Sequence, residues 1–175
     1  MSDVVSEVIY RMSLLEQRLE ALETRDVGNP IAVYKTSAGQ TIENNSEEVV
    51  NFDTAVYDPY SLVTTGASWV YTAPVGGYYY VSTLITFATS TAWALNELLT
   101  IRAFVNGTGG LYLAATRNNN SAAQTYLVSI RGSGIVFANA DDTIALGLLQ
   151  ATGGSLALSN NANLNHISIH RIGAG

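Results

Sequence analysis

The two histidines of the chain, His166 and His170, stand four residues apart in HISIH, a stretch that alternates as a β-strand does. Side chains at i, i+2 and i+4 of a strand share one face, so both imidazoles and Ser168 point the same way. One hypothesis is a ring of imidazoles near a three-fold axis that binds a metal ion or acts as a pH switch. We favour the alternative, two polar positions on the outer face of a half-buried strand.

Asp141 and Asp142 lie in the segment NADD, and carboxylates in a turn are oxygen ligands of the kind that calcium takes. No calcium-binding motif accompanies them, and Asn and Asp are common turn residues in their own right. We therefore predict turn chemistry at this segment, no metal and no cofactor, with a calcium site as the alternative.

The residues of a hydrolase are missing from the sequence. Cysteine is absent, no Gly-x-Ser-x-Gly segment occurs, and both histidines lie near the C-terminus without an ordered acid and serine. The glycine-rich segment NGTGG (106–110) lacks the lysine and the strand-to-helix context of a phosphate loop, so it is predicted to be a hairpin turn. We predict no catalytic residue and no enzyme activity.

Aromatic residues gather in the middle of the chain and raise the question of a carbohydrate platform. Most are expected in the core or at a subunit interface, because alternation divides the run YYY (78–80) between two faces. Trp93, in TSTAWALNE, is the exception. It is predicted to lie in a loop, where a large apolar group indicates a ligand surface.

Composition excludes several classes of protein. Hydrophobic residues make up 47% and charged residues 13%, a balance common in virion and secreted β proteins and against disorder. The net charge is -6 and the 8 Lys and Arg are scattered, so we predict no nucleic-acid binding. The sequence shows neither a membrane span nor, in MSDVVSEV, a signal peptide, so we expect synthesis in the cytoplasm.

A helix is predicted at the N-terminus, ending at Gly28, Asn29 and Pro30. Its apolar residues alternate at spacings of three and four, which indicates a coiled-coil seam made of Val5, Val8, Met12, Leu15, Leu19 and Leu22. In this register Arg11 and Arg18 take g positions and Glu16 and Glu23 take the following e positions, as parallel interhelical ion pairs require. The alternative is an amphipathic helix on its own domain. The seam does not decide between two strands and three.

After Pro30 short β-branched and aromatic runs alternate with turn-rich separators. Strands are predicted at 31–36, 47–53, 67–72, 77–88, 96–105, 110–115, 123–131, 134–138, 142–150, 155–158 and 164–172. RGSG (131–134) is among the predicted turns. The sequence thus predicts a helical stalk, 1–27, and an all-β sandwich or barrel, 28–175.

Two predicted strands, within 76–87 and 143–150, carry continuous apolar or aromatic runs. A strand buried on both faces needs such a run. The second cover is another subunit in one interpretation, and a loop of the same chain in the other.

Residues 50–82 contain an aromatic followed six positions on by an acid, and a later aromatic that leads into a Gly-x-aromatic-x-hydrophobic strand. The residues at these positions are Phe52, Asp58, Tyr71, Gly77, Tyr79 and Val81. This pattern resembles the signature of the globular heads of the complement first-component q and tumour necrosis factor superfamily. NADDTIALGL and HISIHRIG are similar to the last two strands of those heads.

The resemblance implies a ten-stranded jelly roll that forms a homotrimer, with the N-terminal coiled coils gathered along the three-fold axis. The polar composition and short stalk resemble the versions carried by bacteriophage particles. We therefore expect a virion protein, a capsid decoration or head fibre, whose N-terminal segment docks on a capsid or tail protein. The alternative is a tail-fibre head that recognises a host surface glycan; a secreted trimer unrelated to phage is a third possibility.

Overall fold

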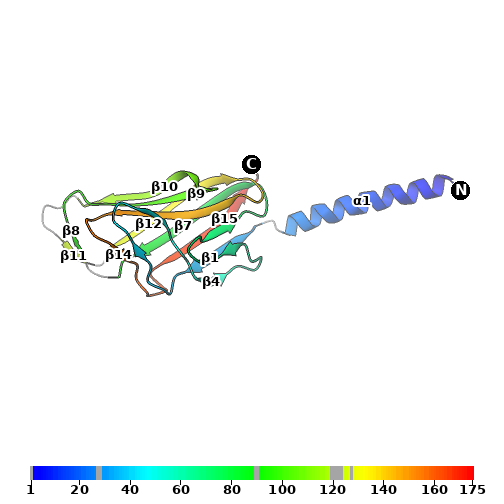
Figure 1. Ribbon diagram of the computed structural model, residues 1–175. Coiled ribbons are helices and arrows are strands. Elements are labelled where there is room, and N and C mark those ends of the chain that lie inside the picture. Colours follow the sequence, from blue (N-terminus) through cyan, green and yellow to red (C-terminus); the bar gives the residue numbers. More distant parts are fainter. Residues whose placement is uncertain (1, 27–28, 89–90, 119–123, 127) are drawn as a thin grey trace.

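The computed structural model describes residues 2–26, 29–88, 91–118, 124–126 and 128–175. Helix α1 (Ser2–Asp26) covers the predicted heptads, and Figure 1 shows it projecting away from a β body that holds the rest of the described chain. A 25-residue helix that meets no neighbour along its length cannot owe its position to packing on the β body. The predicted N-terminal helix is therefore confirmed. The predicted coiled coil needs further copies of the chain, so it stays a prediction.

The β body is a sandwich of two antiparallel sheets, as predicted. One sheet has five strands, in the order β12 (Ser129–Ala138), β7 (Gly77–Thr86), β15 (His166–Gly173), β1 (Ile31–Lys35) and β4 (Thr54–Tyr57). Consecutive strands of this sheet come from distant parts of the chain. The sheet therefore joins the region after the helix to the C-terminus, and Figure 1 shows the C-terminus at the end of the body from which α1 departs.

The second sheet has six strands. Its order is β10 (Thr108–Arg117), β9 (Leu98–Val105), β13 (Thr143–Ala151), β6 (Val70–Thr72) and β5 (Val63–Thr64), and β3 (Glu47–Val49) also pairs with β13. Two small pairings complete the body: β8 (Thr91–Trp93) with β11 (Gln124–Tyr126), and β2 (Thr41–Ile42) with β14 (Leu156–Ala157). The described strands exceed both the eleven predicted from the sequence and the ten that the resemblance implies, because pairings of two or three residues leave little trace in the sequence.

The core between the two sheets is built around aromatic residues. The Trp69 ring meets Phe52 at a centroid distance of 5.3 Å and Tyr34 at 6.1 Å, both edge to face. Tyr71 and Tyr79 make a similar pair at 5.7 Å. Offset and edge-to-face contacts of this kind are the favourable arrangements of aromatic rings. All of these side chains are buried, so Trp69, Tyr71 and Tyr79 of the mid-chain aromatic residues belong to the core.

The prediction of a turn at RGSG is wrong, because Arg131–Gly134 lies in the middle of β12. A Cβ atom on Gly132 would lie 2.9 Å from Leu113, and one on Gly134 would lie 2.7 Å from the Leu113 side chain. Because these two glycines have no side chains, β10 can approach β12 closely at this point. The glycines are therefore strand residues and do not form a turn.

The two continuous apolar runs differ in how they are covered. Strand β13 is buried along most of its length, and its outer side is covered by the same chain: a Cβ on Gly147 would meet the Phe104 ring. Strand β7 alternates at its start, with Tyr78 exposed and Tyr79 buried, and becomes continuously buried only from Thr83 onward. The prediction of a strand buried on both faces is thus confirmed for 143–150, where the same chain covers the second face. For 76–87 it is confirmed only at the end of the strand.

Candidate functional site

The outer face of the five-stranded sheet is organised into rows by the strand register. Residues on this face alternate with the core residues of each strand, and the pairing places them side by side across β1, β15, β7 and β12. The rows are Ile31–His170–Tyr80–Ile135, then Val33–Ser168–Ser82–Ser133, then Lys35–His166–Leu84–Arg131. The face is consequently apolar at one end, hydroxyl-rich in the middle and cationic at the other end.

The apolar end of this face is extensive and exposed. Tyr78 and Phe137 are cross-strand partners whose rings lie 5.5 Å apart, and each keeps nearly half of its surface exposed. Ile135 is exposed by 51%. Tyr80 lies 5.3 Å from the His170 ring. Aromatic and branched side chains in one patch are unusual on the surface of a protein without a partner.

The apolar surface continues around the edge of the sandwich. At this edge β10 lies against β12, and a Cβ on Gly134 would meet the Leu111 side chain at 3.0 Å. Leu111 itself is exposed by 41%. An apolar edge with Leu111 therefore adjoins strand β12 of the apolar face.

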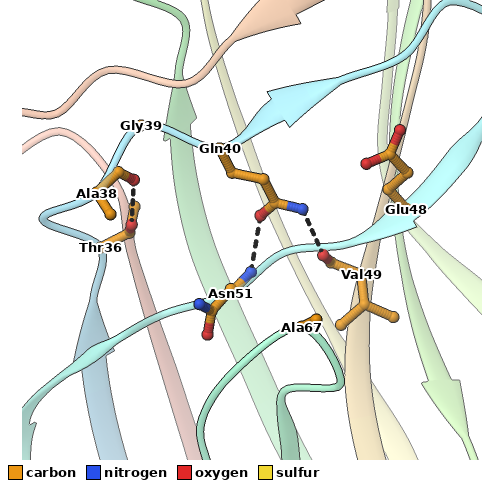
Figure 2. Close-up of a pocket in the computed structure, with 8 residues that line it drawn as sticks. All are labelled: Thr36, Ala38, Gly39, Gln40, Glu48, Val49, Asn51 and Ala67. Carbon is orange, nitrogen blue, oxygen red and sulfur yellow. Dashed lines mark hydrogen bonds between the residues drawn. The ribbon is translucent and has the colours of Figure 1, made fainter.

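A polar groove of about 510 Å³ opens elsewhere on the body. Its lining residues are Thr36, Ala38, Gly39, Gln40, Glu48, Val49, Asn51 and Ala67. Figure 2 shows the Gln40 amide spanning the groove, where it donates to the Val49 carbonyl oxygen at 2.8 Å and accepts from the Asn51 N–H at 2.9 Å. Glu48 accepts a hydrogen bond from the Glu43 N–H at 2.7 Å. The lining offers two side-chain amides, one hydroxyl and one carboxylate, a set suited to hydrogen bonding.

The signature residues have structural positions. Phe52, Tyr71, Tyr79 and Val81 are buried in the core. Gly77 is required by space, because a Cβ there would lie 2.3 Å from the Gly173 carbonyl oxygen.

Asp58 differs from the other signature residues because its carboxylate organises a turn. Its Oδ1 accepts from the Leu62 N–H at 3.0 Å, its Oδ2 accepts from the Val63 N–H at 3.3 Å, and Oδ2 also accepts from the Tyr34 hydroxyl at 2.8 Å. Burial, with help from this carboxylate, raises the pKa of Tyr34 to about 12. Asp58 therefore ties the 58–63 turn to the core strand β1.

The seam residues of α1 whose side chains the structure describes are exposed within one chain. Val8, Met12 and Leu15 are exposed by at least half, whereas Val5, Leu19 and Leu22 fall outside the side chains that the structure describes. Arg11 is ion-paired at 2.9 Å with Glu7 of its own helix. Its predicted interhelical pairing with Glu16, and that of Arg18 with Glu23, stay predictions; the Glu23 side chain is also outside the described set.

The histidines lie on one face of β15, as predicted, and take separate rows. His166 adjoins Lys35 and Leu84, whereas His170 adjoins Tyr80. Burial, followed by the positive charge of Arg131, lowers the pKa of His166. Among the described residues no group of three or more His, Asp or Glu is arranged to hold a metal ion.

The carboxylate of Asp142 accepts hydrogen bonds from residues of its own turn and of a neighbouring turn. Its Oδ1 accepts from the Asn106 amide at 2.7 Å and its Oδ2 accepts from the Asn139 N–H at 2.7 Å. These bonds lower the pKa of Asp142. Asp141 has a φ of 68°, a left-handed conformation that Asp tolerates in turns. The carboxylate thus serves the junction of two hairpins.

The prediction that Trp93 lies in a loop is wrong. Trp93 is the last residue of the short strand β8, and its backbone pairs with Gln124. Its side chain lies outside the described set. A three-residue strand paired with another short strand has no alternation pattern long enough to be recognised.

Comparison with known proteins gives a fold but not a family. No protein-family model matches the chain, and no curated protein matches it in sequence. Among solved structures, Eiger TNF from S. frugiperda superposes with a TM-score of 0.57 at 14% identity, covering 84% of this chain and 94% of that one. The globular domain of zebrafish complement 1qA protein gives 0.56 at 12%, covering 84% and 99%. Murine APRIL gives 0.56 at 10%, covering 82% and 99%.

The β body has the jelly-roll fold of the tumour necrosis factor and complement q heads. The predicted resemblance is thereby confirmed at the level of fold. At these identities the likeness carries no partner, ligand or activity to this chain.

Two surfaces were missed by the sequence analysis: the polar groove and the cationic row. The groove is lined by loop residues around 36–40, 48–51 and 67, none of which forms a motif. The row joins residues that lie far apart in the chain, and only the strand register brings them together.

Proposed function

We propose that the chain is a non-enzymatic, trimeric structural protein of a bacteriophage particle, a capsid decoration or head fibre. The observation that carries the assembly is the exposed apolar end of the five-stranded sheet, with Tyr78, Ile135 and Phe137, beside the exposed apolar edge at Leu111. When an edge of one copy packs on the face of the next, the contact is heterologous, and such contacts form a ring when the rotation between copies closes. Three copies close the ring in this proposal, with the three α1 helices on the same side.

The N-terminal helix is the docking element in the proposal. It projects from the body with apolar side chains exposed, which requires partner helices, a particle surface or both. Ile9 and Leu14 lie outside the predicted seam and are exposed by 62% and 43%. They leave apolar surface for a capsid or tail protein after the seam is filled. Among the described residues no helix combines the length and apolar character that a bilayer crossing requires.

The second candidate function is recognition of a host surface glycan by a tail-fibre head. The polar groove in Figure 2 favours it, since amide and hydroxyl groups are the usual hydrogen-bonding partners of sugars. A glycan array with residues 28–175 tests this function. Binding that Asn51→Ala abolishes and Leu95→Ser retains would support it, and no binding across the host's polysaccharides would contradict it.

The assembly is tested with a matched pair of substitutions. Ile135 and Leu95 are exposed to a similar extent, 51% and 48%, but Ile135 lies on the proposed interface and Leu95 in a loop next to β8. Ile135→Ser is expected to weaken the trimer measured by light scattering, and Leu95→Ser to leave it unchanged. Equal masses for both variants across a dilution series would contradict this interface.

Attachment to the particle is tested separately. Removal of residues 1–27 is expected to abolish binding to particles that lack the protein, while the remaining body keeps its fold by circular dichroism. Normal attachment of the shortened chain would contradict docking through the helix.

A further inference from the structure

The cationic row of the five-stranded sheet forms one side of a pocket of about 450 Å³. Arg131 and His166 flank Leu84 on the strands on either side, and both line the pocket. Ser82 and Ser133 line it from the neighbouring row. The pocket thus combines a guanidinium, an imidazole and two hydroxyls on one concave surface.

No carboxylate lines this pocket, and its cations lack acidic partners. In the described part of the chain the ion pairs are Arg11–Glu7 and Arg102–Glu47, so neither Arg131 nor Lys35 is neutralised. Lys35 is the cross-strand partner of His166 and adds a further cation at the rim. A group of cations held together by strand register, without an acid, favours a bound anion.

The pocket also belongs to the face that packs in the proposed trimer. Strand β12 carries Arg131 four residues before Ile135 and on the same side of the sheet. In the proposed trimer, packing of that face against the edge of the next copy dehydrates the Arg131 guanidinium, and an unpaired buried charge is costly. An anion beside Arg131 offsets this cost.

We propose that the pocket binds an oxyanion, a phosphate or sulfate group, between Arg131 and His166 with Ser82 and Ser133 as hydroxyl donors. The planar guanidinium matches two oxygens of such a group, and the hydroxyls donate to the others. The pocket itself is formed within one chain; the inference rests on the proposed function only for the link between the anion and the trimer. The group is either a free ion or part of a sulfated or phosphorylated polymer.

The binding test uses calorimetry on the full chain at constant ionic strength, with sodium phosphate, sodium sulfate and sodium chloride as probes. Saturable binding of phosphate or sulfate but not chloride is expected. Arg131→Met is expected to lower the affinity by about tenfold or more, since a charged hydrogen bond is lost. Arg117→Met, which removes an exposed arginine of β10 outside the pocket, is the matched control and is expected to change it less than about twofold.

A second readout follows the imidazole directly. The His166 pKa, measured by NMR, is expected to rise when phosphate is added, because the anion stabilises the charged ring against burial and Arg131. The groups that face it are Lys35 on β1, Arg131 on β12, and Tyr80 and Leu84 on β7. His170, which lies two rows away from Arg131 and does not line the pocket, is expected to respond less. An equal response of both histidines, or none, would overturn the proposal. Ser133→Ala, which removes one donor without a charge, is a milder variant if Arg131→Met fails to fold.

The source of the anion is tested with dextran sulfate against uncharged dextran. If free phosphate or sulfate binds, the ligand of the pocket is a free ion. If only dextran sulfate binds, the ligand is a group carried by a polymer. If neither binds, the inference is overturned. Light scattering with and without phosphate separates the two proposals. A trimer that binds no anion overturns the site and leaves the assembly, whereas a monomer that binds phosphate overturns the assembly and leaves the site.

Discussion

The Tyr34 hydroxyl donates a 2.8 Å hydrogen bond to Asp58 Oδ2. The bond joins a core strand of the five-stranded sheet to the turn that leads to β5, and the same carboxylate holds two N–H groups of that turn. Asp58 is the acid of the recognised signature, so the signature marks a structural junction.

Loss of this junction is expected to destabilise the β body. Tyr34→Phe removes one hydrogen bond to a charged acceptor and should lower the free energy of unfolding by about 1.5–3 kcal/mol. Asp58→Ala removes three acceptor contacts and should cost more. Urea unfolding of the two single variants and the double variant measures the coupling. A coupling energy of zero would contradict a direct contribution of the bond.

The free energy of unfolding is expected to depend on pH in the alkaline range, because the pKa of Tyr34 is raised. The folded pKa is about 12 and the ordinary value is 10.0, so the folded state favours the protonated phenol. The stabilisation is fully present below pH 10 and is lost as the pH rises from 10 toward 12. The difference in unfolding free energy between the wild type and Tyr34→Phe should therefore shrink across this interval. A constant difference would contradict the assignment.

An acid dependence is expected at Asp53. Burial acts to raise the pKa of this carboxyl, but hydrogen bonds from Thr54, Ser37 and Ala38 outweigh it and lower the pKa. The resulting stability is present above the unfolded pKa and is lost as the pH falls through the folded one. Asp53→Asn should flatten the acid limb of the stability curve measured by thermal unfolding. An unchanged limb would show that other carboxylates control it.

Gly77 and Gly154 provide a matched pair for the role of space. A methyl group at Gly77 would meet the Gly173 carbonyl oxygen and the Arg171 guanidinium, whereas nothing lies within 4 Å of the same atom at Gly154. Gly77→Ala is expected to lower the free energy of unfolding by about 1–3 kcal/mol, and Gly154→Ala by less than about 0.5 kcal/mol. Similar values for the two would mean that the β7–β15 junction adjusts without cost.

Sequence patterns predicted the helix, most of the longer strands and the sandwich, because each depends on periodicity within one segment. The failure at RGSG has a physical cause: glycine marks a turn and also a close approach of two strands, and at Gly132 and Gly134 the second applies. The alternation in HISIH placed both histidines on one face correctly. The row that Lys35 and Arg131 share with His166 depends on register between distant strands, which no local pattern reveals.

In the proposed trimer, the β body assembles through the outer face of its five-stranded sheet. The most direct test is the mass of the full chain and of residues 28–175, measured by light scattering at low micromolar concentration. The account predicts a trimer in both cases, with Phe137→Asp reducing the body to a monomer because a charge enters the exposed apolar cluster. A monomeric body beside a trimeric full chain would assign assembly to the heptads of α1 and contradict the proposed interface.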